Sequence, residues 1–253
     1  MLHHEIRSGI TILRLDHGKA HAIDVELATA LRDAFAEIES AGNARAVVLT
    51  GTGSIFCAGV DIVRLVNEGP DYVDPFVSAM TDMIVTQFRY PLPLVAAING
   101  HAIAGGCVLA AGCDYRLMAS NAGKIGVPEL RVGLPFPLVA IEVLRFATSE
   151  AHLQELVYRG KTYAVEEAYE RGLVDEVVEP EALLDRAIDV ATQLGSEPPA
   201  RFRITKQQLR RPTLDRMKQY ARETQEAVIA AWKDPASFAA IRAYLDEIKK
   251  NRA

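Results

Sequence analysis

The stretch INGHAIAGGCVLAAGCD, residues 98–114, belongs to a longer segment in which no Asp, Glu, Lys or Arg occurs between Tyr90 and Cys113. An uncharged segment of this length is long enough to span a bilayer as a helix. Two prolines at its start, Pro91 and Pro93, and the glycines inside it interrupt such a helix. A buried strand, a turn and a buried helix explain the missing charge without a membrane.

The glycine pair Gly105-Gly106 stands where the strand and the helix of this stretch would meet. Residues 94–98 form a short apolar run that is typical of a buried strand, and residues 105–112 are predicted to be a tightly packed helix. The pair therefore has two explanations: a tight structural turn, or a place where the backbone approaches a ligand closely. The stretch alone does not decide between them.

Upstream of this stretch, predicted strands alternate with predicted helices, which indicates an α/β domain with buried parallel strands. The helix at 25–40 has apolar residues at three- and four-residue spacing and follows a capping residue, Asp24. TGSIFCAG, residues 52–59, is predicted to be a loop. The expected order is strands at 3–7 and 10–15, the helix at 25–40, a strand at 44–51, helices from about 61 and at 75–89, the strand at 94–98, the helix at 105–112 and a strand at 114–119.

Downstream, KIGVPELRVGL (residues 124–134) is expected to be a short strand and a loop, and the pattern is then mostly helical. GSEPPA at 195–200 has the composition of a linker. We therefore expect an α/β core at 1–195 and a helical tail at 196–253. The predicted helices lie at 137–146, 149–158, 164–171 and 181–194 in the core, and at 201–209, 213–232 and 235–249 in the tail.

The composition is that of a globular protein of 253 residues, 49% hydrophobic and 24% charged. The formal net charge of -5 argues against a general nucleic-acid binder. MLHHEIRSGI lacks the basic and apolar regions of a secretory signal, so we expect a cytoplasmic location and no membrane association. Three cysteines fit free buried thiols in a reducing compartment, and no spacing predicts a metal site. They are Cys57, Cys107 and Cys113.

Two loops share one design, because FCAGVDI (56–62) and AIAGGCVL (102–109) each place glycine just before a predicted helix. The first turn of a helix has unpaired backbone N–H groups, and glycine lets a ligand approach them. Two such groups directed at one point would form an oxyanion hole. Taken singly, each loop is better explained as a tight turn.

Glu129 in GVPEL is a candidate catalytic carboxylate, although on its own it is better explained as the start of a helical turn. Burial beside Val108, Leu130 and Val132 is expected to raise its pKa. No Ser-His-Asp arrangement, phosphate-binding loop or dinucleotide-binding motif is recognisable. Four histidines have no evident partners and are expected to be structural or solvated: His17, His21, His101 and His152.

The combination changes this interpretation. FCAGVDI, then NGHAIAGGCVLAAGCDYRLMA, then GVPELRVGL, in this order and at these intervals, resemble the crotonase superfamily of acyl-CoA enzymes. The resemblance covers essentially the whole chain. It implies a spiral of repeated ββα turns, with C-terminal helices that build trimers and often hexamers. The runs AGGCVLAAGCDYR and SFAAIRAYLDEI are most similar to the Δ3,Δ2-enoyl-CoA isomerases.

By position, the resemblance implies that the backbone N–H groups of Val60 and Gly105 are the oxyanion donors and that Glu129 is the acid/base. The family usually has asparagine where this chain has His21. No metal is implied, and no cofactor beyond the coenzyme A that is part of the substrate. The positions implied to bind CoA or the substrate are Ala22, Ala58, Gly59, Asp61, Ile62 and Gly106.

Val108 is the main departure from the hydratases that this chain resembles. Those hydratases carry a second glutamate at this position, in a GGGCEL-like run. Their water addition uses two carboxylates, whereas a single glutamate suits a proton shift from C2 to C4 of a 3-enoyl-CoA. The resemblance therefore favours an isomerase. A hydratase or another crotonase-type reaction is the alternative, and a non-catalytic acyl-CoA or RNA binder is less favoured.

Basic residues gather at the start of the tail. They are interpreted first as a solvated helix face that balances an acidic core. The other interpretation is contact with the phosphates of CoA, including CoA bound to a neighbouring subunit. Nucleic-acid binding is not supported, because no aromatic residues are interleaved with the charges. The residues are Arg201, Arg203, Lys206, Arg210, Arg211, Arg216 and Lys218.

Overall fold

A six-stranded sheet forms the centre of the molecule in the computed structural model, which describes residues 1–250 apart from the side chain of Arg222. The strands are in the order β1-β2-β3-β5-β7-β10, and all neighbours are parallel except the antiparallel pair β1-β2. Their bounds are β1 (Leu2–Arg7), β2 (Ile10–Leu15), β3 (Ala46–Gly51), β5 (Leu94–Ile98), β7 (Tyr115–Ala119) and β10 (Glu176–Val178).

Helices cover this sheet, and this is why its central strands are apolar throughout. Every residue of β3 and β5 is buried, as expected for parallel strands with both faces covered. The helix α9 (Leu183–Leu194) contacts β3, β5 and β7, while α1 (Val25–Ala41) packs against α3 (Val73–Arg89). Asp24 caps α1 by accepting a hydrogen bond from the backbone N–H of Leu27, as the sequence predicts.

A second sheet of four very short strands lies beside the first, in the order β4-β6-β8-β9. The first three are mutually parallel, and β9 is antiparallel to β8. The prediction of a loop at 52–59 was therefore wrong for part of that segment. The strand within that segment has three residues, too few for alternation to mark it in the sequence. The bounds are β4 (Ile55–Cys57), β6 (His101–Ile103), β8 (Ile125–Gly126) and β9 (Thr162–Tyr163).

The chain passes three times from the first sheet to the second and then into a helix. β3 leads to β4 and α2 (Ile62–Glu68), β5 leads to β6 and α4 (Gly105–Ala111), and β7 leads to β8 and α5 (Glu129–Val132). These are the repeated ββα turns implied by the sequence resemblance. Gly100 lies at one crossing, where a Cβ atom would stand 2.0 Å from the carbonyl oxygen of Ser54, so only glycine fits there.

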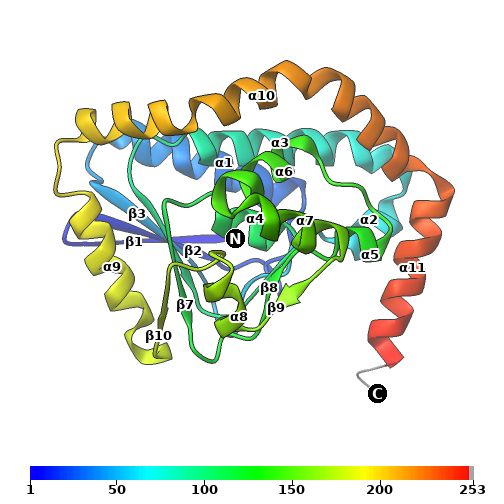
Figure 1. Cartoon of the computed structure of the whole chain (residues 1–253), viewed down its shortest axis with the longest axis horizontal. Helices are drawn as coiled ribbons and strands as arrows, with labels where there is room; N and C mark the ends of the chain where they lie inside the picture. The colour runs from blue at the N-terminus through cyan, green and yellow to red at the C-terminus, as the bar shows by residue number, and fades with distance from the viewer. Residues whose placement is uncertain (251–253) are drawn as a thin grey trace.

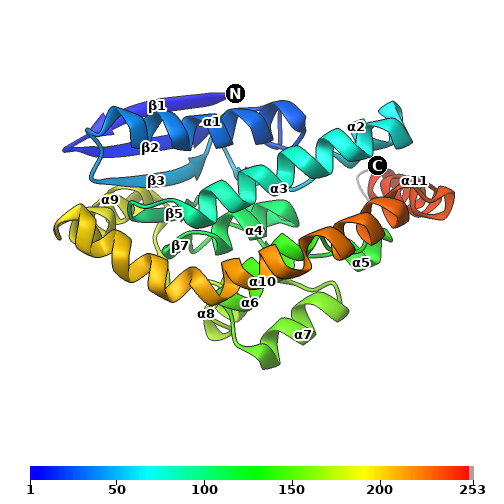
Figure 2. The same ribbon diagram turned by 90° about the horizontal axis from the view of Figure 1, so that it is seen from above.

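The C-terminal region is helical and lies along the core. Figure 1 shows α10 (Pro199–Lys233) running across the molecule above α3, and Figure 2 shows it passing α6 (Leu138–Ala147); α10 contacts both helices. Its last part leads to α11 (Pro235–Lys250), which contacts α2 and α5. The remaining elements are α7 (Glu150–Tyr158), α8 (Val165–Glu170) and the 3-10 turns η1 (Pro70–Tyr72) and η2 (Pro180–Ala182).

The two helices predicted at 201–209 and 213–232 are one helix. Pro212 lies inside α10 and does not end it. A proline in a helix loses one backbone hydrogen bond and favours a kink, but packing on both sides of Pro212 holds the helix together here. Arg210 and Thr213 are both buried against the core, so tertiary contacts override the local signal.

The uncharged segment between Tyr90 and Cys113 is divided between β5 and α4, which are buried throughout, and β6, in which only Ala102 is buried. Within residues 1–250, no helix combines the length and the apolar character needed to cross a membrane. The three cysteines are buried free thiols, as the sequence predicts.

Candidate active site

Three parallel strands of the second sheet end at one edge, and each leads directly to a predicted catalytic residue. β4 leads to Val60, β6 to Gly105 and β8 to Glu129. The backbone N–H of Ala104 donates to the carbonyl oxygen of Gly126 at 2.7 Å, which holds the ends of β6 and β8 together. Ligand sites of α/β proteins commonly lie outside the carboxyl ends of parallel strands, and this edge has that geometry.

The N–H of Val60 is free because of how its segment pairs with Ile23. Ile23 donates to the carbonyl oxygen of Gly59 at 2.7 Å and accepts from the N–H of Asp61 at 2.9 Å. In a parallel bridge, the residue between those two partners points its own N–H away from the pairing. Among the described residues, the N–H of Val60 has no hydrogen-bond acceptor.

The N–H of Gly105 is free because it starts a helix. Ala104 precedes it with φ 53° and ψ -123°, and its carbonyl oxygen accepts from the N–H of Val108 inside α4. The N–H and C=O groups of a trans peptide point in opposite directions, so the N–H of Gly105 points out of the helix start. A Cβ atom on Gly105 would stand 3.8 Å from the nitrogen of Val60. The two free N–H groups are therefore close neighbours.

Different structural requirements explain the glycines of the two loops. At Gly59, where φ is 82°, a Cβ atom would stand 2.5 Å from the Cβ of Ala104 and 2.9 Å from the nitrogen of Gly105. At Gly106, a Cβ atom would stand 2.1 Å from the carbonyl oxygen of Cys57. Both positions are needed for close packing of the loops. The structural explanation of Gly106 is thus sufficient, whereas Gly105 also presents a free donor.

Glu129 is the first residue of α5, and its carboxyl group is buried. The atom Oε2 has no hydrogen-bond partner among the described residues. Burial raises the pKa of Glu129 to about 8, and a hydrogen bond from its own backbone N–H opposes this shift. Burial first, and then the charge of Glu129, raise the pKa of the Cys107 thiol. The carboxyl group therefore lies near α4, the helix that begins with Gly105.

The apolar surroundings of Glu129 agree only in part with expectation. Val108 and Val132 are buried, with 2% and 6% of their surface exposed, but Leu130 is 44% exposed. Leu130, the second residue of α5, is exposed, so the expectation that it helps to bury the carboxyl group was wrong. Val108 stands on α4 where the hydratases that this sequence resembles carry their second glutamate. Among residues 1–250, no group of three or more His, Cys, Asp or Glu side chains is placed to hold a metal ion.

The positions implied to bind CoA lie on two adjacent segments. Residues 20–24 run beside residues 57–61, since the N–H of Ala58 donates to the carbonyl oxygen of Ala20 at 3.0 Å. Asp61 caps α2 by accepting from the N–H of Arg64 at 2.9 Å. The half-buried residues that this arrangement brings together are Ala22, Ala58, Asp61 and Ile62, with the buried Gly59 between them.

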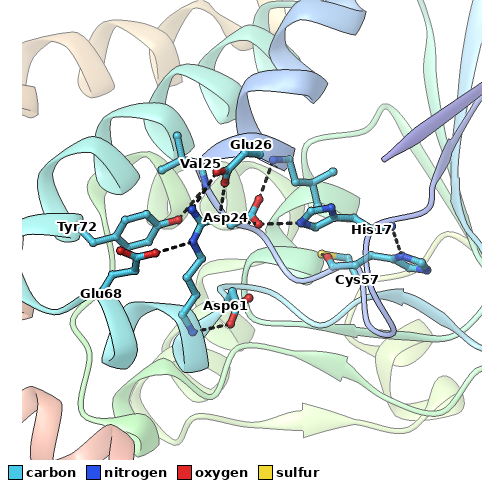
Figure 3. A network of polar contacts seen from close by, with 11 residues as sticks. His17, Asp24, Val25, Glu26, Cys57, Asp61, Glu68 and Tyr72 are labelled. Atoms are coloured by element: carbon cyan, nitrogen blue, oxygen red, sulfur yellow. Dashed lines mark hydrogen bonds and ion pairs between the residues drawn. The ribbon is translucent and has the colours of Figure 1, made fainter.

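A network of charged side chains joins these segments, and no sequence pattern predicted it (Figure 3). Arg64 on α2 forms ion pairs with Asp24 at 3.1 Å, with Glu26 and with Glu68 at 3.6 Å. Its guanidinium also lies over the ring of Tyr72, 5.0 Å from the centroid. Burial opposes ionisation of Asp24, but its hydrogen bonds and the charge of Arg64 hold its pKa below the usual range.

Two histidines expected to have no partners belong to this region. The Nε2 atom of His17 lies 2.8 Å from Oδ2 of Asp24. His21, at φ 49°, accepts a hydrogen bond from the N–H of His17 and places its Nε2 2.9 Å from the carbonyl oxygen of Thr52. His21 is buried, so its structural interpretation stands. Its left-handed backbone suits histidine and asparagine better than most residues.

The basic residues of the tail do not form a single solvated face. Lys206 and Arg210 are buried and both bind Asp114, at 2.6 Å and 2.7 Å, while Arg216 binds the buried Glu142 at 2.7 Å. The interpretation as a solvated face was wrong for these three. Three others pair with exposed carboxylates, and no ion pair joins the fourth to another described residue: they are Arg201, Arg203 and Arg211, and Lys218.

Comparison with known proteins identifies the family. The family model described as enoyl-CoA hydratase/isomerase matches residues 5–250. The chain belongs to the enoyl-CoA hydratase/isomerase family. It is 32% identical to a putative enoyl-CoA hydratase of Thermus thermophilus over 197 aligned residues, and this alignment covers 77% of each chain. It is 26% identical over 248 residues to human mitochondrial enoyl-CoA delta isomerase 1, which covers 97% of this chain and 82% of the human one.

The fold agrees with solved structures of this family. The crystal structure of human mitochondrial Δ3-Δ2-enoyl-CoA isomerase matches with a TM-score of 0.94 and 23% identity, over 100% of this chain and 99% of that chain. The crotonase fold with its C-terminal helical region, which the sequence resemblance implied, is thereby confirmed. Relatives named as isomerases and as hydratases both occur at 26% to 33% identity, so identity alone does not separate the two reactions.

Proposed function

We propose that this protein is an acyl-CoA isomerase that converts 3-enoyl-CoA to 2-enoyl-CoA. The observation that carries the proposal is one buried carboxylate oxygen, Oε2 of Glu129, without a hydrogen-bond partner among the described residues, in a chain that has Val108 at the position where the hydratases it resembles carry their second glutamate. Water addition needs two groups, one to activate water and one to supply a proton. A double-bond shift needs only one group that takes a proton and returns it.

Glu129 takes the proton from C2 of the 3-enoyl thioester. The electrons of the C2–H bond form a double bond between C1 and C2, and the carbonyl electrons move to the thioester oxygen. The dienolate then reforms its carbonyl group, the new double bond forms between C2 and C3, and C4 takes the proton back from Glu129. Atoms and electrons balance without water, an oxidant or a metal, so the product has the mass of the substrate.

The N–H groups of Val60 and Gly105 are proposed to hold the thioester oxygen of the dienolate. They are neighbours without an acceptor among the described residues; Val60 is held by its bridge to Ile23, and Gly105 begins α4. Removing one such donor from an oxyanion hole typically costs about 3 kcal/mol of transition-state stabilisation. The buried, uncharged surroundings provided by α4 strengthen these hydrogen bonds, because the local dielectric constant is low.

The CoA part of the substrate is proposed to lie along residues 20–24 and 57–62. Ala22, Ala58, Gly59, Asp61 and Ile62 line this path, and their small or half-buried side chains leave backbone groups within reach. Gly106 is proposed to act through packing, since it lies against Cys57. No cofactor is needed beyond the CoA thioester itself.

A product analysis by mass tests the proposal. The purified protein would be given 3-hexenoyl-CoA and, separately, 2-hexenoyl-CoA. Interconversion of the two at unchanged mass is expected. A product heavier by one water would instead establish a hydratase, and no reaction with either substrate would favour another crotonase-type reaction or binding without catalysis.

A hydratase is the second candidate, because relatives at 31% to 33% identity include proteins named as hydratases. The variant Val108→Glu separates the two. It places a second carboxylate on α4, at the position of the second glutamate of the hydratases, and we expect it to gain measurable hydration of 2-hexenoyl-CoA that the unmodified protein lacks. Val108→Gln is the matched control, because it has similar volume without the charge. If the unmodified protein and both variants all hydrate 2-hexenoyl-CoA at the same rate, the isomerase assignment is contradicted.

Two further proposals concern assembly and location. The tail helices α10 and α11 are proposed to contribute to a homotrimer or hexamer, to be tested by light scattering of the purified chain. A cytoplasmic location is supported by three free, buried thiols, which are typical of reducing compartments. Fractionation of cells that express the tagged protein tests it.

A further inference from the structure

Residues 20–24 hold the loop that carries Val60. Four contacts join the two segments: Ala58 N–H to the carbonyl oxygen of Ala20, the thiol of Cys57 to the carbonyl oxygen of His21 at 3.1 Å, and both backbone hydrogen bonds of Ile23. The loop and the strand it follows are therefore fixed from outside their own ββα turn. Ile23 is the residue of this segment that lies directly opposite Val60.

The backbone of Ile23 fixes the direction of the Val60 N–H. The carbonyl oxygen of Gly59 and the N–H of Val60 belong to one planar peptide group and point in opposite directions. Ile23 binds that carbonyl oxygen at 2.7 Å. Because the plane is rigid, holding the oxygen on one side directs the N–H to the other side, toward the edge where Gly105 and Glu129 lie.

The side chain of Ile23 lies beside the other donor. Its Cδ1 atom stands 2.8 Å from the point that a Cβ atom on Gly105 would occupy. Ile23 is completely buried, so the methyl group has a fixed position in a close-packed interior. Within the described chain, Ile23 thus contacts both peptide segments that present free N–H groups, one through its backbone and one through its side chain.

The neighbour of Ile23 is itself firmly held. Asp24 caps α1, and its carboxylate also contacts the side chains of His17 and Arg64 (Figure 3). Arg64 belongs to α2, which begins two residues after Val60. The segment is therefore anchored on both sides of the loop that it supports. Because the segment is held in place, a smaller side chain at Ile23 does not shift the whole segment. It changes the packing of residue 23 against Gly105 instead.

We propose that Ile23 is a positioning residue that sets the separation of the Val60 and Gly105 N–H groups. The proposal rests on the proposed function, since it assumes that these groups hold the thioester oxygen. Oxyanion stabilisation depends on donors lying about 2.7–3.1 Å from the oxygen, a window only about 0.4 Å wide. Removing the Cδ1 methyl lets the start of α4 move toward the vacated space, which changes that separation without removing any group that touches the substrate.

The test compares Ile23→Val with Ile12→Val. Both substitutions delete one Cδ1 methyl from a buried isoleucine, but Ile12 lies in β2 and pairs with Val48 in the first sheet. We expect Ile23→Val to lower kcat for 3-hexenoyl-CoA about tenfold, a part of the 10²–10³-fold cost of losing a donor, with KM changed less than twofold. Ile12→Val is expected to keep the unmodified kcat, although both variants lose similar stability.

A second readout isolates the oxyanion contact. Acetoacetyl-CoA forms a stable enolate whose absorbance reports its fraction on the protein, and Ile23→Val is expected to lower that fraction about tenfold while Ile12→Val does not. If Ile23→Val does not fold, Ile23→Leu and Ile12→Leu repeat the comparison with the methyl group moved rather than deleted. Equal kcat and equal enolate binding in a matched pair would overturn the role of Ile23. An unmodified protein that turns over neither hexenoyl-CoA would overturn the proposed function instead.

Discussion

Glu129 concentrates the proposed chemistry in one carboxyl group. We expect Glu129→Gln to lower kcat for 3-hexenoyl-CoA by about 10²–10⁴-fold, the usual contribution of a positioned general base. The amide has nearly the same shape, so the affinity for CoA thioesters is expected to change little. Steady-state kinetics and calorimetric titration with hexanoyl-CoA measure the two quantities. A variant that keeps more than a tenth of the activity would show that another group moves the proton.

The raised pKa of Glu129 predicts the pH dependence of activity. Only the ionised form takes a proton from C2, and burial holds the pKa at about 8. We therefore expect kcat/KM to rise about tenfold per pH unit below pH 8 and to level off above it. The pH profile of kcat/KM with 3-hexenoyl-CoA measures this. A profile that is flat from pH 6 to pH 9 would show that the carboxyl group ionises more easily than its burial indicates.

The same pKa predicts a pH-dependent stability difference. The folded state holds the proton up to about pH 8, whereas the unfolded chain loses it near 4.5. The stabilising contribution of this group is thus present below pH 4.5 and is lost as the pH rises to 8. Glu129→Gln has no such loss, so its free energy of unfolding relative to the unmodified protein should rise between pH 5 and pH 8. Urea unfolding at several pH values measures it, with Glu166→Gln as an exposed control.

At the level of elements, the sequence predicted the parts that have a strong pattern. The strands β2, β3, β5 and β7 and the helices α1 and α3 lie within a few residues of their expected positions, because long apolar runs and helical periodicity mark them. Most of the second sheet was missed. A short strand was expected within residues 124–134, where β8 lies, but β4, β6 and β9 were not predicted. These strands have two or three residues each, and they form only because the sheet pairs them.

This omission limits what the sequence reveals of the site. The three loops were recognised by their resemblance to a family, not by any pattern that places them together. Val60, Gly105 and Glu129 converge because β4, β6 and β8 are parallel and end at one edge. The network of Arg64 and Asp24 was equally hidden, since ion pairs between distant elements leave no local signal.

The glycine pair at the start of α4 provides a prediction at this scale. Gly106→Ala places a methyl group 2.1 Å from the backbone oxygen of Cys57 and is expected to cost about 1–3 kcal/mol of stability or more. Gly105→Ala meets only the end of the Ile23 side chain at less than 3 Å, so it should cost less. The double variant Gly105→Ala, Ile23→Val should recover part of that cost, because the new methyl group takes the vacated space. Chemical unfolding measures all three, and strict additivity would contradict the packing argument.

At the scale of the whole molecule, the tail belongs to the packing of the core. The side chain of Trp232 donates to the carbonyl oxygen of Pro135 at 2.9 Å, close to α5, and α11 contacts both α2 and α5. Lys206 and Arg210 reach past the surface to Asp114, between α4 and β7, and also bind the carbonyl oxygens of Leu92 and Phe88. The linker composition of 195–200 marks a break between helices, while these contacts tie the following helix to the strands beneath it.

Asp114 is the common partner of these contacts, and its loss tests their weight. It accepts from Lys206, Arg210 and the backbone N–H of Leu94. Asp114→Asn leaves two cations buried without a counter-charge, which typically costs about 3–5 kcal/mol. The exposed pair Arg211 and Asp215 provides the control, since Asp215→Asn should change stability by less than about 1 kcal/mol.

Chemical unfolding of the two variants separates a structural role from a catalytic one. Asp114→Asn is expected to lower the midpoint of unfolding markedly, while kcat at a temperature where the variant is folded stays near its unmodified value, because Asp114 follows the C-terminal end of α4 and Gly105 lies at its N-terminal end. Burial also lowers the pKa of Lys206 to about 8, so neutralising this cation above pH 8 should reduce the penalty of the variant. A destabilisation equal to that of Asp215→Asn would show that the ion pairs of Asp114 contribute little to holding α10. A destabilisation that grows above pH 8 would show that the penalty does not come from the charge of Lys206.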